Sequence, residues 1–167
     1  KLKKIERRSK FLLFFFSKDI IMLVHLGMTG KFFFINKKDT KFKTSFYYDI
    51  NNEKDKKHDR VVFFLNNNQK LIYNDVRKFG FIKFFNSKNI NNNLHLNNLG
   101  PEPLAEEFNY AYFKKYITGR NRQIKSIIMD QKFVSGIGNI YANEILFLSK
   151  VRPYRKVKTI KNFELKK

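Results

Sequence analysis

The sequence contains no cysteine. These 167 residues therefore hold no disulfide and no thiolate metal site. No apolar run approaches the length of a membrane-spanning helix. The apolar run at residues 11–16 follows a basic segment, but it is short and no small-residue cleavage site comes after it, so we exclude a secretory signal peptide. The first residue is Lys1 rather than methionine, and we expect the sequence to be a fragment of a longer protein.

Acidic residues are also few. They number 14 against 35 lysines and arginines, which gives a net charge of +21 at pH 7. A positive charge of this size favours a polyanionic partner, and nucleic acid is the first candidate. Two plainer causes of the charge stay open. Many lysines can simply solvate a Phe-rich surface, and codon bias in an AT-rich genome produces the same joint excess of lysine, asparagine, isoleucine and phenylalanine.

The length allows one domain or two small ones. In the first half, turn formers separate short apolar runs rich in phenylalanine, isoleucine and valine. These runs predict six strands, at residues 11–16, 20–25, 31–35, 61–65, 70–73 and 80–85. Strands at this spacing are typical of a sandwich or a barrel. The lysine-rich stretch 36–57 is predicted to be a long exposed loop, and the asparagine-rich stretch 86–98 a linker.

A domain boundary is predicted where two prolines, Pro101 and Pro103, prevent a helix or strand from continuing. The predicted domains are residues 1–98, which are β, and residues 99–167, which are helical.

Apolar residues at helical spacing predict a helix that starts near Leu104. Glu106 and Glu107 lie at the positive end of this predicted helix, and Lys114 and Lys115 at its negative end.

A pair of short helices is predicted within residues 121–150. Ile124, Ile127 and Ile128 fall on one helical face, and the pattern breaks at the Gly136–Gly138 turn before a second apolar period. Asn139 is a suitable N-cap for the second helix, so the amides around it would form an anion site, with phosphate as the anion. The plain alternative is a helix–helix turn without a ligand, because a lone Gly-x-Gly is a weak signal.

Six segments together carry a resemblance to a known family. They are Arg7–Lys10 (RRSK), His25–Gly30 (HLGMTG), Lys57–Asp59 (KHD), Tyr73–Gly80 (YNDVRKFG), Leu99–Leu104 (LGPEPL) and Met129–Ala142, which runs from MDQ to GIGNIYA. In this order they resemble the formamidopyrimidine-DNA glycosylases, bacterial base-excision repair enzymes. The resemblance implies an α+β fold, in which a helix–two-turn–helix DNA-binding domain follows an N-terminal β-sandwich-like domain.

The resemblance also implies roles for five polar residues. Lys10 would contact phosphate and move a proton during strand cleavage. His58 and Arg77 would hold the DNA backbone, and Arg120 would make a third basic contact. Asn139 would bind phosphate in the helical motif.

A further trio, Met28, Arg77 and Phe79, resembles the family's base-flipping wedge. An enzyme that extrudes a base must fill the gap and support the orphaned partner base. Methionine and phenylalanine can enter the stack, and arginine can hydrogen-bond the unpaired base. The alternative for Met28 and Phe79 is ordinary core packing. Both neighbour glycines in predicted loops, which favours exposed tips.

The sequence also departs from the family pattern. The N-terminal proline nucleophile, the glutamate beside it and the four-cysteine zinc finger are not among these residues. Serine stands at Ser9, where the family has glycine, so the local turn is expected to differ. No cofactor is expected in this chain, and zinc belongs to the finger only by resemblance.

The resemblance implies a DNA glycosylase with AP lyase activity toward oxidised purines. We expect the chain to be its DNA-binding middle part and to be inactive alone. The expected partner is double-stranded DNA with oxidised bases or abasic sites. We further expect a monomer, without membrane association, in the bacterial cytoplasm near the nucleoid. The alternative is a catalytically inactive remnant that binds DNA or RNA through the same helical motif, and a ribosomal binder would need no wedge.

Overall fold

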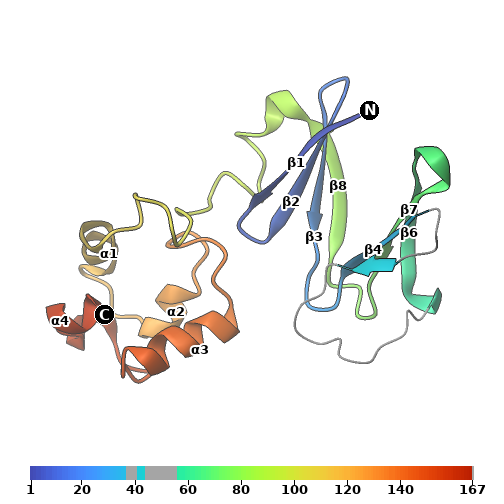
Figure 1. The fold of residues 1–167 in the computed structure, drawn as a ribbon. Coiled ribbons are helices and arrows are strands. Elements are labelled where there is room, and N and C mark those ends of the chain that lie inside the picture. The colour runs from blue at the N-terminus through green and yellow to red at the C-terminus, as the bar shows by residue number, and fades with distance from the viewer. Residues whose placement is uncertain (37–40, 44–55, 167) are drawn as a thin grey trace. The chain divides into compact units, whose positions relative to one another are not determined.

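The computed structural model describes residues 1–36, 41–43 and 56–166. These residues form two compact units (Figure 1). The β unit comprises Lys1–Ile5 and Phe11–Phe85, and the helical unit comprises Glu6–Lys10 and Asn86–Lys167. Each unit has its own apolar core.

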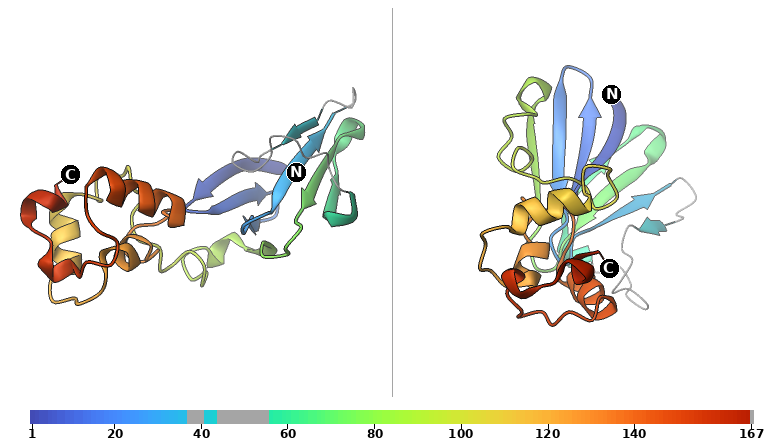
Figure 2. Two further views of the ribbon diagram at one scale, coloured as in Figure 1. Left: turned by 90° about the horizontal axis from the view of Figure 1, so that it is seen from below. Right: turned by 90° about the vertical axis from the view of Figure 1, so that its left-hand side faces the viewer.

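The β unit contains two four-stranded sheets. The first has the order β1 (Leu2–Arg8), β2 (Phe11–Phe16), β3 (Ile20–His25), β8 (Phe81–Asn86), and these strands lie side by side in the right-hand view of Figure 2. The second has the order β5 (Lys41–Lys43), β4 (Lys31–Ile35), β7 (Lys70–Asn74), β6 (Asp59–Phe64). The pairings β2–β3, β4–β5, β4–β7 and β6–β7 are antiparallel.

The core of the β unit lies between the two sheets. Phe14 and Met22 come from the first sheet, and Phe32 and Tyr73 from the second, and all four are buried in one cluster. The rings of Phe14 and Phe32 meet edge to face, with their centroids 5.9 Å apart. In β6, burial alternates along the strand, as expected when one face of a sheet packs on a core. The predicted sandwich-like architecture is confirmed.

All six predicted strands are confirmed, with ends that shift by one or two residues. Two strands were missed. β1 reads LKKIERR and is exposed along almost its whole length, so it shows no apolar alternation that could reveal a strand. β5 lies inside the predicted loop 36–57, which corrects that prediction for Lys41–Lys43. Residues 37–40 and 44–55 of that loop lie outside the described residues.

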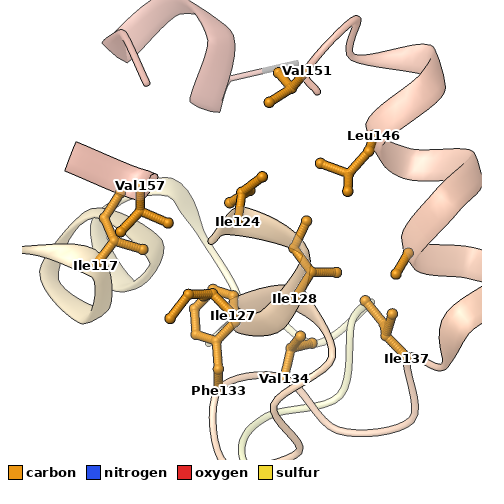
Figure 3. Packing of buried hydrophobic residues seen from close by; sticks show 11 residues of the cluster. Ile117, Ile124, Ile127, Ile128, Phe133, Val134, Ile137, Leu146, Val151 and Val157 are labelled. Carbon is orange, nitrogen blue, oxygen red and sulfur yellow. The ribbon is translucent and has the colours of Figure 1, made fainter. Parts of the chain in front are cut away.

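The helical unit is built from α1 (Tyr110–Ile117), α2 (Ile124–Ile128), α3 (Asn139–Leu148) and the short α4 (Asn162–Leu165). Ile124, Ile127 and Ile128 of α2 are buried together at the centre of its core (Figure 3). The predicted apolar face of this helix is therefore the face that packs. With a β-sandwich followed by helices, the predicted α+β class is confirmed.

Two predicted helix starts were wrong. The first helix begins at Tyr110 rather than near Leu104, because the Asn109 side chain caps it by accepting a hydrogen bond from the Tyr112 amide at 3.0 Å. Glu106 therefore precedes the helix. Asn139 is the first residue of α3 and not its N-cap.

The N-cap of α3 is Gly138, which makes no side-chain cap and leaves the first amides of the helix open.

The compact units are divided along a different line from the predicted domains. The chain passes from the β unit to the helical unit after Phe85, so residues 86–98 are grouped with the helical unit. Residues Glu6–Lys10 also belong to the helical unit, although β2 follows them directly. Their hydrogen bonds to residues near 100 and 130 account for this membership and are described below.

Phe133 is fully buried and sits among four aromatic rings of the helical unit, including Tyr116 at 4.6 Å and Phe113 at 4.9 Å between centroids. We expect Phe133→Ala to lower the free energy of unfolding by about 3–5 kcal/mol, because it leaves a cavity that the surrounding rings cannot fill. Denaturant unfolding followed by helical circular dichroism measures this. Phe147→Ala, at a side chain 78% exposed, should cost less than about 0.5 kcal/mol. Equal losses would contradict the central role of Phe133.

Candidate nucleic-acid interface

Two loops of the β unit lie back to back. One joins β3 to β4 and contains Gly27, and the other joins β7 to β8 and contains Phe79 and Gly80. Gly27 has a φ of +64°, and a Cβ built on it would lie 2.7 Å from the Gly80 nitrogen and from the Phe79 carbonyl carbon. Only glycine permits both this backbone conformation and this approach.

Asp75 is fully buried beneath both loops. Its Oδ1 accepts a hydrogen bond from Thr29 Oγ1 at 2.5 Å. Its Oδ2 accepts from the Gly80 amide at 2.9 Å and from the Tyr73 hydroxyl at 3.1 Å. Thr29 Oγ1 also accepts from the Arg77 amide at 3.1 Å. One carboxylate therefore joins the loop of Thr29 to the loop of Arg77 and Gly80.

The donors around Asp75 hold it in the ionised form. Burial by itself raises the pKa of this carboxyl, but the hydrogen bonds from Thr29, Gly80, Tyr73 and the Lys78 backbone outweigh burial and lower the pKa below its usual range. Tyr73 is affected as well, because burial and the adjacent Asp75 carboxylate raise the pKa of its hydroxyl. The carboxylate is therefore charged near neutral pH.

The tips of the two loops carry exposed Met28, Arg77 and Phe79. Met28 is 65% exposed and Phe79 is 56% exposed, so neither packs in the core of the β unit. The guanidinium carbon of Arg77 lies 4.5 Å from the centroid of the Phe79 ring, a cation–π contact. The three side chains that the family resemblance groups together therefore lie on the two loops that Asp75 joins.

His58 is joined to the same site through its backbone. Its carbonyl oxygen accepts a hydrogen bond from the Asp75 amide at 3.0 Å. Nearby, Arg60 Nε donates to the Asp75 carbonyl oxygen at 2.9 Å. Four predicted site residues of the β unit, His58, Met28, Arg77 and Phe79, thus lie on segments that Asp75 holds.

In the helical unit, Glu102 fixes the segment that contains Lys10. Its Oε1 accepts from the Ser9 amide at 2.6 Å and from Arg8 at 2.8 Å, and its Oε2 accepts from Arg7 at 2.9 Å. Burial raises the pKa of Glu102, but these donors prevail and lower it to about 2.

Arg8 completes the attachment by donating to Ser135 Oγ at 2.7 Å and to the Gly100 carbonyl oxygen at 2.6 Å. Ser9 has a φ of 55°, which lies in the left-handed region that glycine adopts more readily than serine. That this turn differs from the turn of the family stays a prediction.

Gln131 organises the turn that leads into α3. Its Oε1 accepts from the Gly136 amide at 2.8 Å and from Ser9 Oγ at 3.3 Å, and its Nε2 donates to the Ile137 carbonyl oxygen at 2.8 Å. The Lys10 ammonium donates to that same carbonyl oxygen at 3.3 Å. A single glutamine therefore positions the glycine turn and the lysine together.

Lys10 lies beside the start of α3. A Cβ built on Gly138 would lie 3.0 Å from Lys10 Nζ, so the ammonium stands beside the N-cap of α3. Asn139 is the next residue, and the open amides there carry the positive end of the helix dipole. Desolvation lowers the pKa of Lys10. An ammonium and a helix N-terminus at one place both attract an anion such as phosphate.

Arg120 lies elsewhere on the helical unit, at the end of α1. Its Nε donates to the Tyr116 carbonyl oxygen at 2.5 Å, and its guanidinium carbon lies 4.2 Å from the centroid of the Tyr116 ring. It lines a cavity of about 410 Å³ together with Lys114 and Lys158. The contacts of Arg120 are thus distinct from those that unite Lys10 with Gly138.

The residues present do not fit a zinc site of the finger type. There is no cysteine, and the part of the chain that the structure describes has no group of three or more histidine, aspartate or glutamate residues placed to hold a metal. None of the helices within residues 1–36, 41–43 and 56–166 has the length and apolar character needed to cross a bilayer.

Comparison with known proteins identifies the family. Residues 1–82 match the formamidopyrimidine-DNA glycosylase N-terminal domain, and residues 99–167 match the formamidopyrimidine-DNA glycosylase H2TH domain. The chain belongs to the formamidopyrimidine-DNA glycosylase family. Both matches keep the chain order that the six sequence segments indicated.

Individual relatives carry the same family name. A formamidopyrimidine-DNA glycosylase of Rhodopseudomonas palustris (strain TIE-1) is 38% identical over 156 residues, which is 93% of this chain and 53% of that protein. One from Rickettsia felis is 39% identical over 149 residues, which is 89% of this chain and 49% of that protein. The chain spans about half the length of the curated relatives it matches.

Solved structures show the same fold. A complex of the Lactococcus lactis glycosylase with DNA containing an abasic site superposes with a TM-score of 0.81 at 29% identity, and covers 98% of this chain and 55% of that one. A complex of the Lactococcus lactis protein with DNA containing Fapy-dG gives a TM-score of 0.80, with 98% and 56% covered. Both neighbours were solved with damaged DNA bound.

Sequence reasoning singled out the exposed residues of these glycosylase segments but missed two acids that hold them. Asp75 stands directly after an apolar strand and between loops that contain glycine. Glu102 stands between Pro101 and Pro103. The chain has only 14 acids, so an acid inside a rigid, apolar or glycine-bearing segment was the signal that could have indicated a structural role.

The pH dependence of stability tests the role of Glu102. Because its folded pKa of about 2 lies below the ordinary value of 4.5, its contribution is fully present above about pH 4.5 and is lost as the pH falls toward 2. We expect Glu102→Gln to lower the melting temperature at pH 7 and to converge with the wild type near pH 2.

Glu107→Gln, at an exposed glutamate, is the control and should change the melting temperature little at either pH. A Glu102→Gln deficit of the same size at pH 7 and pH 2 would contradict the ionic anchor. Thermal unfolding followed by circular dichroism measures the melting temperatures of the wild type and of both variants at pH 7 and at pH 2.

Proposed function

We propose that this chain is the DNA-binding portion of a base-excision repair enzyme that removes oxidised purines from double-stranded DNA and nicks the resulting abasic strand. Family membership supports the enzyme class. The observation that carries the proposal is the exposed trio of Met28, Arg77 and Phe79 on two loops held by one buried carboxylate.

The trio fits the physical demands of base extrusion. Flipping a nucleotide leaves a gap in the stack and an unpaired partner base. Flexible Met28 can fill the gap, and the Phe79 ring can enter a base step as an apolar wedge. Arg77, held over that ring, presents donors to the edge of the orphaned base.

The remaining predicted residues would hold the backbone. Lys10 beside the open N-terminus of α3 is suited to a phosphate, with Asn139 at the first position of that helix. His58, Arg77 and Arg120 would add basic contacts. A net charge of +21 makes such electrostatic binding strong at low salt.

Lys10 also has the properties of a proton carrier. Desolvation lowers its pKa, which makes release of a proton near neutral pH easier than for a fully hydrated lysine. We propose this role for the elimination step that nicks the abasic strand. The family nucleophile is an N-terminal secondary amine, and a primary ammonium is a poor substitute for it.

DNA binding by the 167-residue chain should depend on Arg77 and Asn139 in different ways. Arg77→Ala should weaken binding to abasic duplex by about 1–3 kcal/mol more than binding to intact duplex, because only the abasic duplex offers an orphan base. Asn139→Ala should weaken both about equally, since phosphates are common to both. Equilibrium titration of fluorescently labelled duplexes at several salt concentrations measures this, and affinity should fall steeply with salt.

Lys70→Ala is the matched control, because it removes one positive charge from β7 of the same unit. It should affect both duplexes alike. If Arg77→Ala also reduces both affinities equally, Arg77 is only a phosphate contact, and the non-catalytic nucleic-acid-binding alternative gains support.

We further propose that the polypeptide of these 167 residues, assayed alone, neither excises oxidised purines nor forms a covalent adduct with abasic DNA that borohydride can trap. Its amino terminus is the primary amine of Lys1, which hydrogen-bonds Ser17 at 2.7 Å. Adding an upstream Pro-Glu terminus and a four-cysteine finger should bring both activities back. A trapped adduct mapped to Lys1 or Lys10 would overturn this expectation.

A further inference from the structure

We infer that Thr29 and Asp75 are positioning residues that set the geometry of Met28, Arg77 and Phe79 for insertion into DNA. The inference rests on the proposed function, because it accounts for how the wedge is kept ready. Asp75 is fully buried and Thr29 is half-buried, whereas Met28, Arg77 and Phe79 are exposed. Their effect would pass through the three side chains that they hold.

The Thr29 hydroxyl makes two of the hydrogen bonds that connect the two loops. It donates to Asp75 Oδ1 at 2.5 Å and accepts from the Arg77 amide at 3.1 Å. Thr29 directly follows Met28, so one hydroxyl links the methionine tip to the arginine tip. A hydroxyl can donate and accept at once, which neither a methyl group nor an amine at this position would reproduce.

The carboxylate of Asp75 fixes the third tip. It accepts from the Gly80 amide at 2.9 Å, and Gly80 directly follows Phe79. A Cβ on Gly80 would overlap the Tyr73 hydroxyl, which itself donates to Asp75. The acid, the tyrosine and the glycine therefore form one close-packed support beneath the phenylalanine.

The hydrogen bonds of Thr29 and Asp75 have a functional consequence, because they align the three side chains of the wedge before DNA binds. A wedge whose side chains are already aligned loses less conformational freedom when it enters the base stack. Loosening the loops should leave the proposed phosphate contacts of Lys10, Arg120 and Asn139 intact, because those residues lie outside the two loops. The expected signature is a loss of preference for abasic over intact duplex, with affinity for intact duplex retained.

Two substitutions of Thr29 separate the hydroxyl from the bulk of the side chain. Thr29→Val keeps the shape and removes the hydroxyl, so that Asp75 loses a donor and the Arg77 amide loses its acceptor. We expect it to reduce the ratio of abasic to intact duplex affinity by about tenfold, the size expected for one lost hydrogen bond to a charged group. Thr29→Ser keeps the hydroxyl and should retain the ratio.

Asp75→Asn is the second variant. It keeps the shape but replaces one acceptor oxygen with an NH2 donor, so that either Thr29 or Gly80 loses its acceptor, and it should reduce the ratio of abasic to intact duplex affinity at least as much. Val24→Ala is the control for simple destabilisation, because Val24 is fully buried in the core of the same unit. It should lower the melting temperature while keeping the ratio. All affinities are measured well below the lowest melting temperature.

Amide hydrogen exchange provides a readout that does not involve DNA. The Arg77 amide should exchange slowly in the wild type and in Thr29→Ser, and faster in Thr29→Val. The inference is overturned if Thr29→Val keeps both the slow exchange and the affinity ratio, or if Val24→Ala loses the ratio equally. A wild type without any preference for abasic duplex would instead overturn the proposed function. The hydrogen-exchange rate of the Arg77 amide would still decide whether Thr29 holds the two loops together.

Discussion

A fully buried carboxylate is stable only where enough donors surround it, and Asp75 is the point at which the β unit meets that demand. Tyr73 and Gly80 lie near Asp75 in the chain, in β7 and in the β7–β8 loop, whereas Thr29 comes from the β3–β4 loop. If the two loops moved apart, the buried charge would lose its Thr29 donor. Burial of this charge therefore favours the arrangement that holds the two loops of the candidate wedge together.

In the helical unit, Glu102 is likewise a carboxylate that several hydrogen-bond donors hold in place. Three donors from Arg7, Arg8 and Ser9 hold this carboxylate, and the segment so anchored delivers Lys10 to the start of α3. In both units a carboxylate held by several donors fixes segments that carry predicted site residues. The few acids of this strongly basic chain thus include two that organise these segments.

The contrast between buried and exposed phenylalanines has a functional meaning in so Phe-rich a protein. Phe14, Phe32 and Phe133 fill the two cores, where burial of apolar surface stabilises the fold. Phe79 is instead held outward by a turn whose neighbouring glycine leaves no space for a side chain beneath it. Exposure alone does not distinguish Phe79, since Phe147 is more exposed; the fixed turn and the Arg77 guanidinium 4.5 Å from the Phe79 ring do.

The sequence by itself determined the class of fold and most of its elements. Short apolar runs between turn formers predicted six strands, and the spacing of Ile124, Ile127 and Ile128 predicted the face of α2 that packs, because both patterns are local in the sequence. Helix ends were less predictable. The start of α1 depends on one side-chain cap, at Asn109, that several nearby residues could have made, and α3 starts after Gly138 without any side-chain cap.

Only the tertiary structure decided which residues hold the candidate site. Asp75 and Thr29 are 46 positions apart, and Arg8 and Ser135 are 127 apart, so no local pattern could reveal that they meet. The strand β1 was missed for a different reason, since its exposed charged side chains show no apolar alternation and only its pairing with β2 makes it a strand. Local periodicity is written in the sequence, whereas hydrogen bonds between distant segments exist only after the chain has folded.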